Sequence, residues 1–267
     1  MPVHRALVTA RDAGRVSLEA SLDLGRSVHG VRIEPDHWSV ESAAYPYLDR
    51  CKERTIYHWT GTSFDAVSRF GTSLLKLVPT DWGPPTFEID GIKMLPTAKV
   101  SPFEDAAAKV RLIEPRGKWV LDTCGGLGYF AQWCLAGGAK HVRSFEKNAD
   151  VLWLRSLNPW SPASDDPRLE LSLGDVSERI PQLPDASVDA VLHDPPRFGI
   201  AGELYSQAFY DQLARVLRPR GLLFHYTGSP NRLTSGRDVP QEVSTRLARA
   251  GLTTQVIGDG VLGRRHP

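Results

Sequence analysis

Apolar residues follow two different spacings along the chain, and the change falls near residue 100. Before it, short runs partly alternate apolar and polar positions between turn signals such as Asp-Ala-Gly and Asp-Trp-Gly-Pro-Pro. This pattern predicts small antiparallel strands within residues 5–10, 15–22, 28–34 and 68–79. After residue 100, helical and strand spacings alternate, which is typical of a parallel sheet covered by helices on both faces.

The N-terminal part also carries one predicted helix and one predicted hairpin. The helix is expected at residues 46–57, and the hairpin at residues 87–94, where Asp90-Gly91 stands between alternating apolar positions. We therefore divide the chain into a β-rich N-terminal domain, residues 1–98, and an α/β domain, residues 99–267.

Strands and helices are predicted in turn through the second domain. Helices are expected at residues 102–113, 129–136, 149–157, 204–217 and 239–250. Strands are expected at residues 119–122, 141–146, 169–173, 188–193, 222–226 and 253–257. The last segment, residues 260–264, is predicted as an antiparallel edge strand.

The composition is that of an ordinary globular protein. Apolar residues make up 41% and charged residues 24% of 267 residues, and the net charge of +1 gives no global attraction to nucleic acid or membrane. No apolar run approaches the roughly 20 residues that span a bilayer, so no membrane partner is expected. Residues 211–267 nevertheless carry nine Lys/Arg against four Asp/Glu, whereas residues 1–100 carry twelve of each.

Three cysteines, Cys51, Cys124 and Cys134, stand at spacings that match no zinc motif, so no metal is implied. Their odd number, and the expectation that no secretory leader is present, predict a cytoplasmic protein.

A glycine-dense turn is the most informative motif. An apolar run ends in Asp122, and Gly125, Gly126 and Gly128 follow before the next helical pattern. Glycine lets a backbone turn sharply and approach a ligand without a clashing Cβ. The three glycines depart from the dinucleotide fingerprint G-x-G-x-x-G, so the turn alone permits any nucleotide-type cofactor.

Three acids at predicted strand ends make the cofactor more specific. Asp122 can accept from a cofactor amine or position the loop, Glu146 can take both ribose hydroxyls, and Asp175 can accept from an adenine amino group. A nicotinamide enzyme uses the ribose acid but not the other two. The alternative is that each acid only ends a strand or caps a helix.

Together with a later Asp-Pro-Pro loop, these motifs resemble those of class I S-adenosylmethionine-dependent methyltransferases over residues 100–267. The resemblance implies a Rossmann-like sheet and S-adenosylmethionine as cofactor. The residues that would hold it are Asp122, Gly125, Gly126, Gly128, Glu146 and Asp175.

The predicted chemistry lies in the loop His193-Asp194-Pro195-Pro196-Arg197-Phe198. Two prolines remove backbone donors and stiffen the loop, which leaves carbonyls and the Asp194 carboxylate to face an acceptor. Amino methyltransferases orient an exocyclic amine with a similar loop, so that catalysis is mostly positioning. By this resemblance Asp194 and Pro195 would orient the acceptor, and Arg197 would supply specificity.

Two residues of this loop keep alternatives open. His193 is either a general base or a structural hydrogen-bonding group, and Arg197 either binds an anionic group or pairs with an acid such as Glu203. The loop also resembles that of RNA uracil C5-methyltransferases, which need a downstream catalytic cysteine. No cysteine follows Cys134, so that chemistry is not expected.

Residues 199–210 and the later Gly228-Ser229-Pro230 resemble the spermidine synthase family, which also has an N-terminal β-domain. That family binds a diamine with two acids beside this loop. Asp194 matches the first acid, but the second position falls at or near Arg197, whose charge would repel a cationic amine. Taken together, the motifs most resemble a family of predicted spermidine-synthase-like methyltransferases found widely in archaea. These motifs are Thr-Cys-Gly-Gly-Leu-Gly-Tyr, His-Asp-Pro-Pro-Arg-Phe, Ala-Gly-Glu-Leu-Tyr and Phe-His-Tyr.

The sequence therefore predicts an S-adenosylmethionine-dependent methyltransferase that acts on a nitrogen, with an exocyclic amine of RNA as the candidate acceptor and a homodimer as the candidate assembly. One alternative is an aminopropyltransferase that uses decarboxylated S-adenosylmethionine. The other is a cofactor- or RNA-binding module without catalysis.

Overall fold

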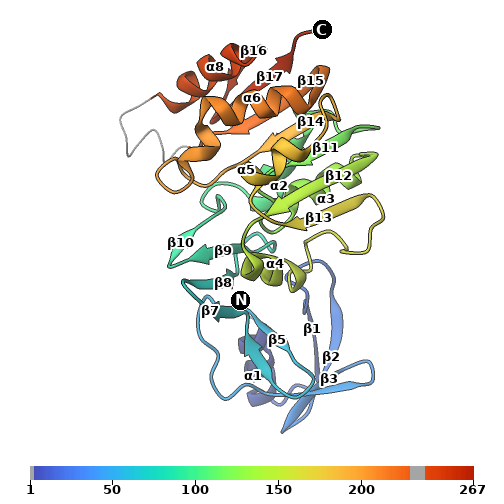
Figure 1. The fold of residues 1–267 in the computed structure, drawn as a ribbon. Coiled ribbons are helices and arrows are strands. Elements are labelled where there is room, and N and C mark those ends of the chain that lie inside the picture. The colour runs from blue at the N-terminus through green and yellow to red at the C-terminus, as the bar shows by residue number, and fades with distance from the viewer. Residues whose placement is uncertain (1–2, 229–237) are drawn as a thin grey trace. The chain divides into compact units, whose positions relative to one another are not determined.

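The structure is a computed structural model that describes residues 3–228 and 238–267, so the predicted motif positions Ser229 and Pro230 lie outside the described residues. It divides into two compact units (Figure 1). The first unit comprises the chain up to Pro102 together with Ser156–Trp160, and the second comprises Phe103–Arg155 and Ser161–Pro267.

The first unit begins with a helix, α1 (Val3–Asp12), where residues 5–10 were predicted as a strand. That prediction is wrong because the apolar residues follow a helical spacing. Leu7 and Ala10 are buried and Val3 packs against the same cluster, which places positions i, i+4 and i+7 on one face.

Two antiparallel sheets and a separate strand pair make up the rest of this unit. The first sheet has the order β1 (Ser17–Ala20), β2 (His29–Ile33), β3 (His37–Val40), β4 (Ala43–Pro46). The second has the order β10 (Ile92–Lys93), β9 (Thr86–Ile89), β8 (Leu74–Val78), β7 (Ser68–Phe70). β5 (Tyr57–Trp59) pairs with β6 (Phe64–Ala66). The strands predicted at 15–22 and 28–34 are confirmed, while 68–79 folds as two strands.

The helix predicted at residues 46–57 is wrong. Pro46 ends β4, Tyr57 begins β5, and the described chain between them has no regular structure. Aromatic residues of the flanking strands pack on one another instead: Tyr45 meets Trp59 at 5.5 Å between ring centroids. This aromatic packing between two sheets favours the extended chain over the predicted helix.

The hairpin at Asp90-Gly91 is confirmed. Both residues have positive φ, 49° and 81°, as the tight turn between β9 and β10 requires. The Asp90 carboxylate also accepts a hydrogen bond from the Leu74 N–H at 2.8 Å, which joins the turn to the neighbouring strand.

The second unit is built on a seven-stranded sheet (Figure 1). Its order is β13 (Leu169–Leu173), β12 (His141–Glu146), β11 (Trp119–Asp122), β14 (Val188–His193), β15 (Leu217–Tyr226), β17 (Gly260–Arg265), β16 (Leu252–Ile257). The neighbouring pairs from β13 to β15 are parallel, and only β17 runs antiparallel to its neighbours. The predicted Rossmann-like architecture is confirmed.

Helices cover both faces of this sheet. They are α2 (Pro102–Arg111), α3 (Tyr129–Ala136), α4 (Ala149–Ser156), α5 (Val176–Arg179), α6 (Gln207–Val216) and α8 (Val239–Arg249). Val176, Leu213 and Val243 of α5, α6 and α8 share one core cluster with Val191 of β14. The next residue, Leu192, points to the opposite face and is also fully buried, as expected of a central parallel strand.

The C-terminal strands correct one prediction. Residues 260–264 were expected at the sheet edge, but β17 inserts between β15 and β16, and β16 forms the edge. Gly260 permits this close approach, because a Cβ there would lie 2.5 Å from the Phe224 ring. Val261 is consequently fully buried.

The helix predicted at 204–217 is two elements. A 3-10 turn, η2 (Gly202–Tyr205), precedes α6, and Ser206 between them caps α6 by accepting from the Phe209 N–H at 3.1 Å.

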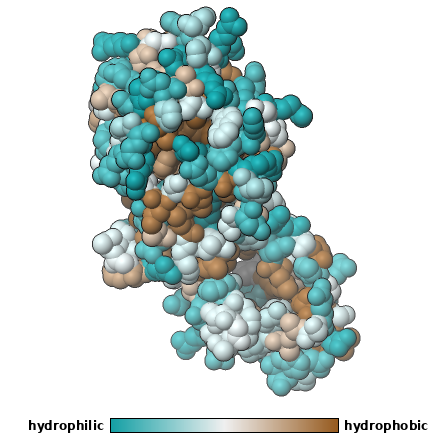
Figure 2. All heavy atoms as spheres, turned by 45° about the vertical axis from the view of Figure 1, so that its right-hand side comes forward, coloured by the Kyte–Doolittle hydropathy of each residue, from teal (hydrophilic) through white to brown (hydrophobic). Residues whose placement is uncertain are grey.

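On the face shown in Figure 2, hydrophilic side chains predominate and hydrophobic ones gather in separate patches. Among residues 3–228 and 238–267, no helix has both the length and the apolar character needed to cross a bilayer.

Candidate functional site

Four acids follow four neighbouring parallel strands. Asp122 ends β11, Glu146 ends β12, Asp175 follows β13 and Asp194 follows β14. Because these strands are adjacent in the order β13-β12-β11-β14, their carboxyl ends meet at one edge of the sheet. Ligands of open α/β sheets bind at this edge, so the structure brings the predicted site together.

The glycine loop is held against β12 by its backbone. The Gly125 N–H donates to the Phe145 carbonyl at 2.7 Å, and the Gly126 N–H donates to Glu146 Oε2 at 3.0 Å. Gly128 has φ +80°, and a Cβ there would lie 2.5 Å from the guanidinium carbon of Arg155. The loop therefore needs glycine both for its conformation and for its close packing.

Asp122 has an unpaired carboxylate oxygen. It is 1% exposed; its Oδ2 accepts from the Ser144 hydroxyl at 2.8 Å, and its Oδ1 has no partner among the described residues. Burial raises the pKa of Asp122 to about 6, although the bond from Ser144 and the charge of Arg155 oppose the rise. A buried orphan acceptor of this kind suits a donor on a bound ligand.

Each carboxylate oxygen of Glu146 accepts one hydrogen bond from a backbone N–H group. Oε1 accepts from the Asn148 N–H at 2.9 Å, and Oε2 accepts from Gly126. Burial raises the pKa of Glu146, while these backbone donors oppose the shift. Each oxygen retains a further lone pair, so the fixed carboxylate can receive two hydroxyls of a sugar.

Asp175 caps α5. Its Oδ1 accepts from the backbone and hydroxyl of Ser177 at 2.9 and 2.7 Å, and its Oδ2 lies 3.4 Å from the Lys147 ammonium. Burial opposes ionisation of Asp175, but the Ser177 bonds and Lys147 outweigh it and lower its pKa. The capping role is thus present in the structure, and Oδ2 keeps capacity for another donor.

Sequence reasoning missed Arg155. It is 4% exposed, its Nη1 lies 3.5 Å from the Ser144 hydroxyl, and its Nη2 has no partner among the described residues. Burial lowers the pKa of Arg155, whereas Asp122 and Glu146 oppose that change. Its burial could have been inferred from its position in the sequence, four residues after Val151 on the apolar face of a predicted helix.

Lys109 was also missed, and it lies beside the predicted acceptor loop. This lysine of α2 is 8% exposed at its side chain, and its Nζ lies 2.7 Å from Asp105 and 3.7 Å from Asp194. It also stands 3.4 Å from the centroid of the Tyr226 ring. The signal was the i,i+4 pair Asp105 and Lys109 on a helix that buries Ala106 between them.

Asp194 is 22% exposed at its side chain, so it can be reached from solvent. Burial raises its pKa, while the Lys109 cation opposes the rise. Pro195 behind it is buried, whereas Pro196 and Arg197 are exposed.

His193 occupies a structural position. It is 1% exposed, its Nδ1 lies 2.7 Å from the Thr123 hydroxyl, and its Nε2 lies 3.1 Å from the Leu204 carbonyl. The carbonyl assigns the proton to Nε2, so Thr123 donates to Nδ1. Burial lowers the pKa of His193 to about 4. Of the two interpretations of His193, this geometry favours the structural one.

Arg197 lies in the exposed part of the loop, where its carbonyl accepts from the Ile200 N–H at 2.7 Å. The ion pair with Glu203 that was one interpretation is absent from the described residues. Phe198, which is 40% exposed, packs its ring edge against Tyr205 at 5.5 Å. The loop after Asp194 thus carries an exposed cationic residue and an exposed aromatic ring.

Comparisons with known proteins find similar methyltransferases. Residues 140–232 match the model of a family described as S-adenosyl-L-methionine-dependent methyltransferase. An uncharacterized protein of Methanocaldococcus jannaschii is 45% identical over 177 residues, which cover 66% of this chain and 60% of that protein. A probable S-adenosylmethionine-dependent methyltransferase of Mycolicibacterium smegmatis is 38% identical over 146 residues, 53% of this chain and 50% of that protein. The chain therefore spans between half and two thirds of the length of these relatives.

A solved spermidine synthase in complex with a transition-state analogue has the same fold, with a TM-score of 0.60 and 16% identity over 79% of this chain and 80% of that one. The fold is that of class I S-adenosylmethionine-dependent methyltransferases, and both the matching family and the Mycolicibacterium smegmatis relative are described by that cofactor. The chain therefore shares its fold with spermidine synthase, as the sequence predicted.

Proposed function

We propose that this protein transfers a methyl group from S-adenosylmethionine to a nitrogen atom of its acceptor. The observation that carries the proposal is the place of Asp194. It follows β14, the neighbour of the strand that leads into the glycine loop, and its carboxylate remains partly open to solvent.

The residues of the loop and the strand ends fit the cofactor. Asp122 Oδ1 would accept from its amine, Glu146 would receive the ribose hydroxyls, and Asp175 Oδ2 would accept from the adenine amino group. Gly125, Gly126 and Gly128 leave room for its close approach. When bound, S-adenosylmethionine supplies an electrophilic methyl group on a positively charged sulfur.

Asp194 would orient the acceptor. Its carboxylate accepts an N–H hydrogen bond, which directs the nitrogen lone pair away from the carboxylate and toward the methyl group. Methylated nitrogen gains a positive charge and then loses a proton. A carboxylate whose pKa burial has raised is suited to take that proton at Oδ1 or Oδ2.

The charges around Asp194 support a neutral acceptor. The Lys109 ammonium lies 3.7 Å from the carboxylate, and Arg197 follows three residues later in the same loop. A diamine cation would approach the Lys109 ammonium at this place, and like charges repel. An exocyclic amine of a nucleobase is neutral, and the exposed Phe198 ring offers a surface for a flat group.

RNA is the acceptor class that we propose, with the cytoplasm as its compartment. The excess of basic residues in the segment 211–267 supports a polyanionic acceptor. The test is transfer of tritium from methyl-labelled S-adenosylmethionine to total RNA, followed by digestion to nucleosides. We expect label in a methylated amino nucleoside with the wild-type protein and none with Asp194→Ala. Undiminished labelling by Asp194→Ala would contradict the role of this loop.

Aminopropyl transfer is the second candidate, because the spermidine synthase fold extends over 79% of this chain. That reaction would join an aminopropyl group from decarboxylated S-adenosylmethionine to a diamine. Incubation of the protein with both compounds and analysis of the polyamine products tests it, and we expect no new polyamine.

A further inference from the structure

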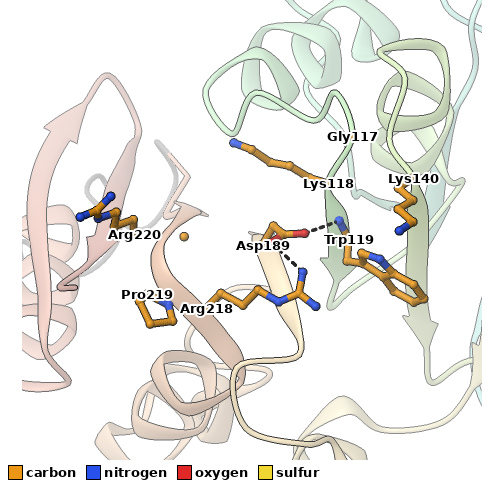
Figure 3. Close-up of a pocket in the computed structure, with 9 residues that line it drawn as sticks. Gly117, Lys118, Trp119, Lys140, Asp189, Arg218, Pro219 and Arg220 are labelled. Atoms are coloured by element: carbon orange, nitrogen blue, oxygen red, sulfur yellow. Dashed lines mark hydrogen bonds and ion pairs between the residues drawn. The ribbon is translucent and has the colours of Figure 1, made fainter.

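A basic pocket lies at the opposite edge of the same sheet, at the amino-terminal ends of the parallel strands (Figure 3). Its volume is about 410 Å³. Four cationic residues, Lys118, Lys140, Arg218 and Arg220, line it together with a single acid, Asp189. Such an excess of one charge around a hollow attracts ligands of the opposite charge.

Asp189 does not neutralise the other cations, because both of its oxygens already have partners. Oδ1 accepts from Arg218 Nη1 at 2.8 Å, and Oδ2 accepts from the Trp119 backbone N–H at 2.8 Å (Figure 3). Arg218 is further fixed by a bond from its Nε to the Ala186 carbonyl at 3.1 Å. These bonds hold the floor of the pocket in place.

The remaining three cations keep most of their charge for a ligand. Lys118 donates to the Ile113 carbonyl at 2.8 Å and lies 3.6 Å from Glu114, whose side chain is 72% exposed, so this pair is strongly screened. Lys140 and Arg220 are exposed, and neither forms an ion pair with any residue in the described part of the chain.

The cations form a strip. Lys140 precedes β12, Lys118 precedes β11, and Arg218 and Arg220 lie at the start of β15, with β14 between. Three strand spacings separate the ends of this strip, roughly 14 Å. Figure 3 shows that the side chains of Arg220 and Lys118 both extend away from Asp189. A strip of cations across several strands suits a chain of phosphates better than a single ion.

We propose that this basic pocket binds backbone phosphates of an RNA acceptor; the proposal rests on the function proposed above and extends it to a second contact. The six residues of β14 separate the pocket from Asp194 by roughly 20 Å. The phosphates bound here therefore belong to nucleotides remote from the methylated one. Their contact raises affinity without reading sequence.

Salt dependence of binding tests the pocket directly. Fluorescence anisotropy with a labelled single-stranded RNA is measured from low to moderate NaCl concentration for the wild type and for the double variant Lys140→Gln, Arg220→Gln. Each lost phosphate contact lowers the slope of log K against log salt by about 0.7, so the double variant should lose about 1.4. The matched control, Arg111→Gln with Arg249→Gln, removes two exposed arginines elsewhere in this unit and should retain the wild-type slope.

An unchanged slope in the Lys140, Arg220 variant would overturn the proposal, and so would an equal loss in the control. Inorganic phosphate, added at constant ionic strength, should not displace the RNA; stoichiometric displacement would make this a small-anion site and overturn the proposal as well. Methylation is read separately. RNA that binds with the expected slopes but accepts no methyl group refutes the proposed function alone, whereas RNA that is methylated with no change of slope refutes the pocket alone.

Discussion

The two edges of the seven-stranded sheet differ in burial and in charge. At the carboxyl-terminal edge, acids are buried among few partners: Asp122 is 1% exposed and has an oxygen without a partner among the described residues. At the amino-terminal edge, cations such as Lys140 and Arg220 are exposed, and both oxygens of Asp189, the acid that lines the pocket, accept hydrogen bonds.

The difference indicates which edge can perform chemistry. Burial at the carboxyl-terminal edge raises the pKa of Asp122 and Asp194, and groups with shifted pKa values in a cleft are typical of functional sites. The exposed cations at the other edge act only through charge, which salt screens. We therefore assign catalysis to the first edge and attraction of a polyanion to the second, and the following experiments test that division.

The largest effect is expected for Asp194→Asn. Loss of the carboxylate removes both the orientation of the nitrogen and the proton acceptor, so kcat should fall by about 10²–10⁴-fold. Calorimetry should show S-adenosylmethionine affinity within about threefold of the wild type, because the change acts on the transition state. Asp185→Asn, at an acid that is 78% exposed before β14, is the control and should retain activity. An equally inactive control would show that the loss is not specific to the loop.

The next effect concerns the stability of the glycine loop. Gly128→Ala should lower the free energy of unfolding by about 3 kcal/mol, because it combines a positive φ with a Cβ that meets Arg155. Gly138→Ala is a matched control at φ +82°, where the nearest atom, Arg116 Cγ, is 3.8 Å away, and it should cost only about 1 kcal/mol. Urea denaturation measures both. Equal losses would show that the close approach to Arg155 is unimportant.

Lys109→Met should move the pH profile of kcat. The Lys109 cation lowers the pKa of Asp194, so its removal lets burial raise that pKa further. The acid limb of the profile should then shift to higher pH. Lys109→Arg keeps the charge and should restore most of the wild-type pH profile. If the pH profile of Lys109→Met matches that of the wild type, Lys109 contributes only packing.

A smaller effect is expected in cofactor binding between pH 5 and 7. With a pKa of about 6, Asp122 is protonated in nine of ten molecules at pH 5 and ionised in about nine of ten at pH 7. Affinity for the cationic S-adenosylmethionine should therefore increase about tenfold as pH rises across this range. Asp122→Asn should bind weakly and without this dependence. Calorimetry at three pH values decides, and a flat wild-type profile would contradict the role of Asp122.

The elements of the second unit could be predicted from sequence because each carries a local pattern. The bounds of β11, α3, β12, β13 and β14 are as predicted, since apolar strand runs and amphipathic helices alternate clearly there. The place of β17 could not be predicted, because its insertion depends on Gly260 meeting Phe224, a contact distant in sequence. In the first unit, the short apolar spacing of α1 was misread as a strand.

The site was predictable to a similar degree. Acids at strand ends could be placed together because parallel strands end at one edge. Arg155 and Lys109 could not be assigned to the site from sequence, because a charged residue on a helix is ordinarily exposed. Their burial depends on tertiary packing beside Asp122 and Asp194. The role of His193 also required the structure, because its ring nitrogens face Thr123, which is 70 residues away in the sequence, and the Leu204 carbonyl, which is 11 residues away.

The most direct test of the account compares the binding of S-adenosylmethionine with that of its decarboxylated form by calorimetry. The account assigns this site to methyl transfer and therefore predicts tighter binding of S-adenosylmethionine itself. A clear preference for the decarboxylated compound would contradict that assignment and favour aminopropyl transfer.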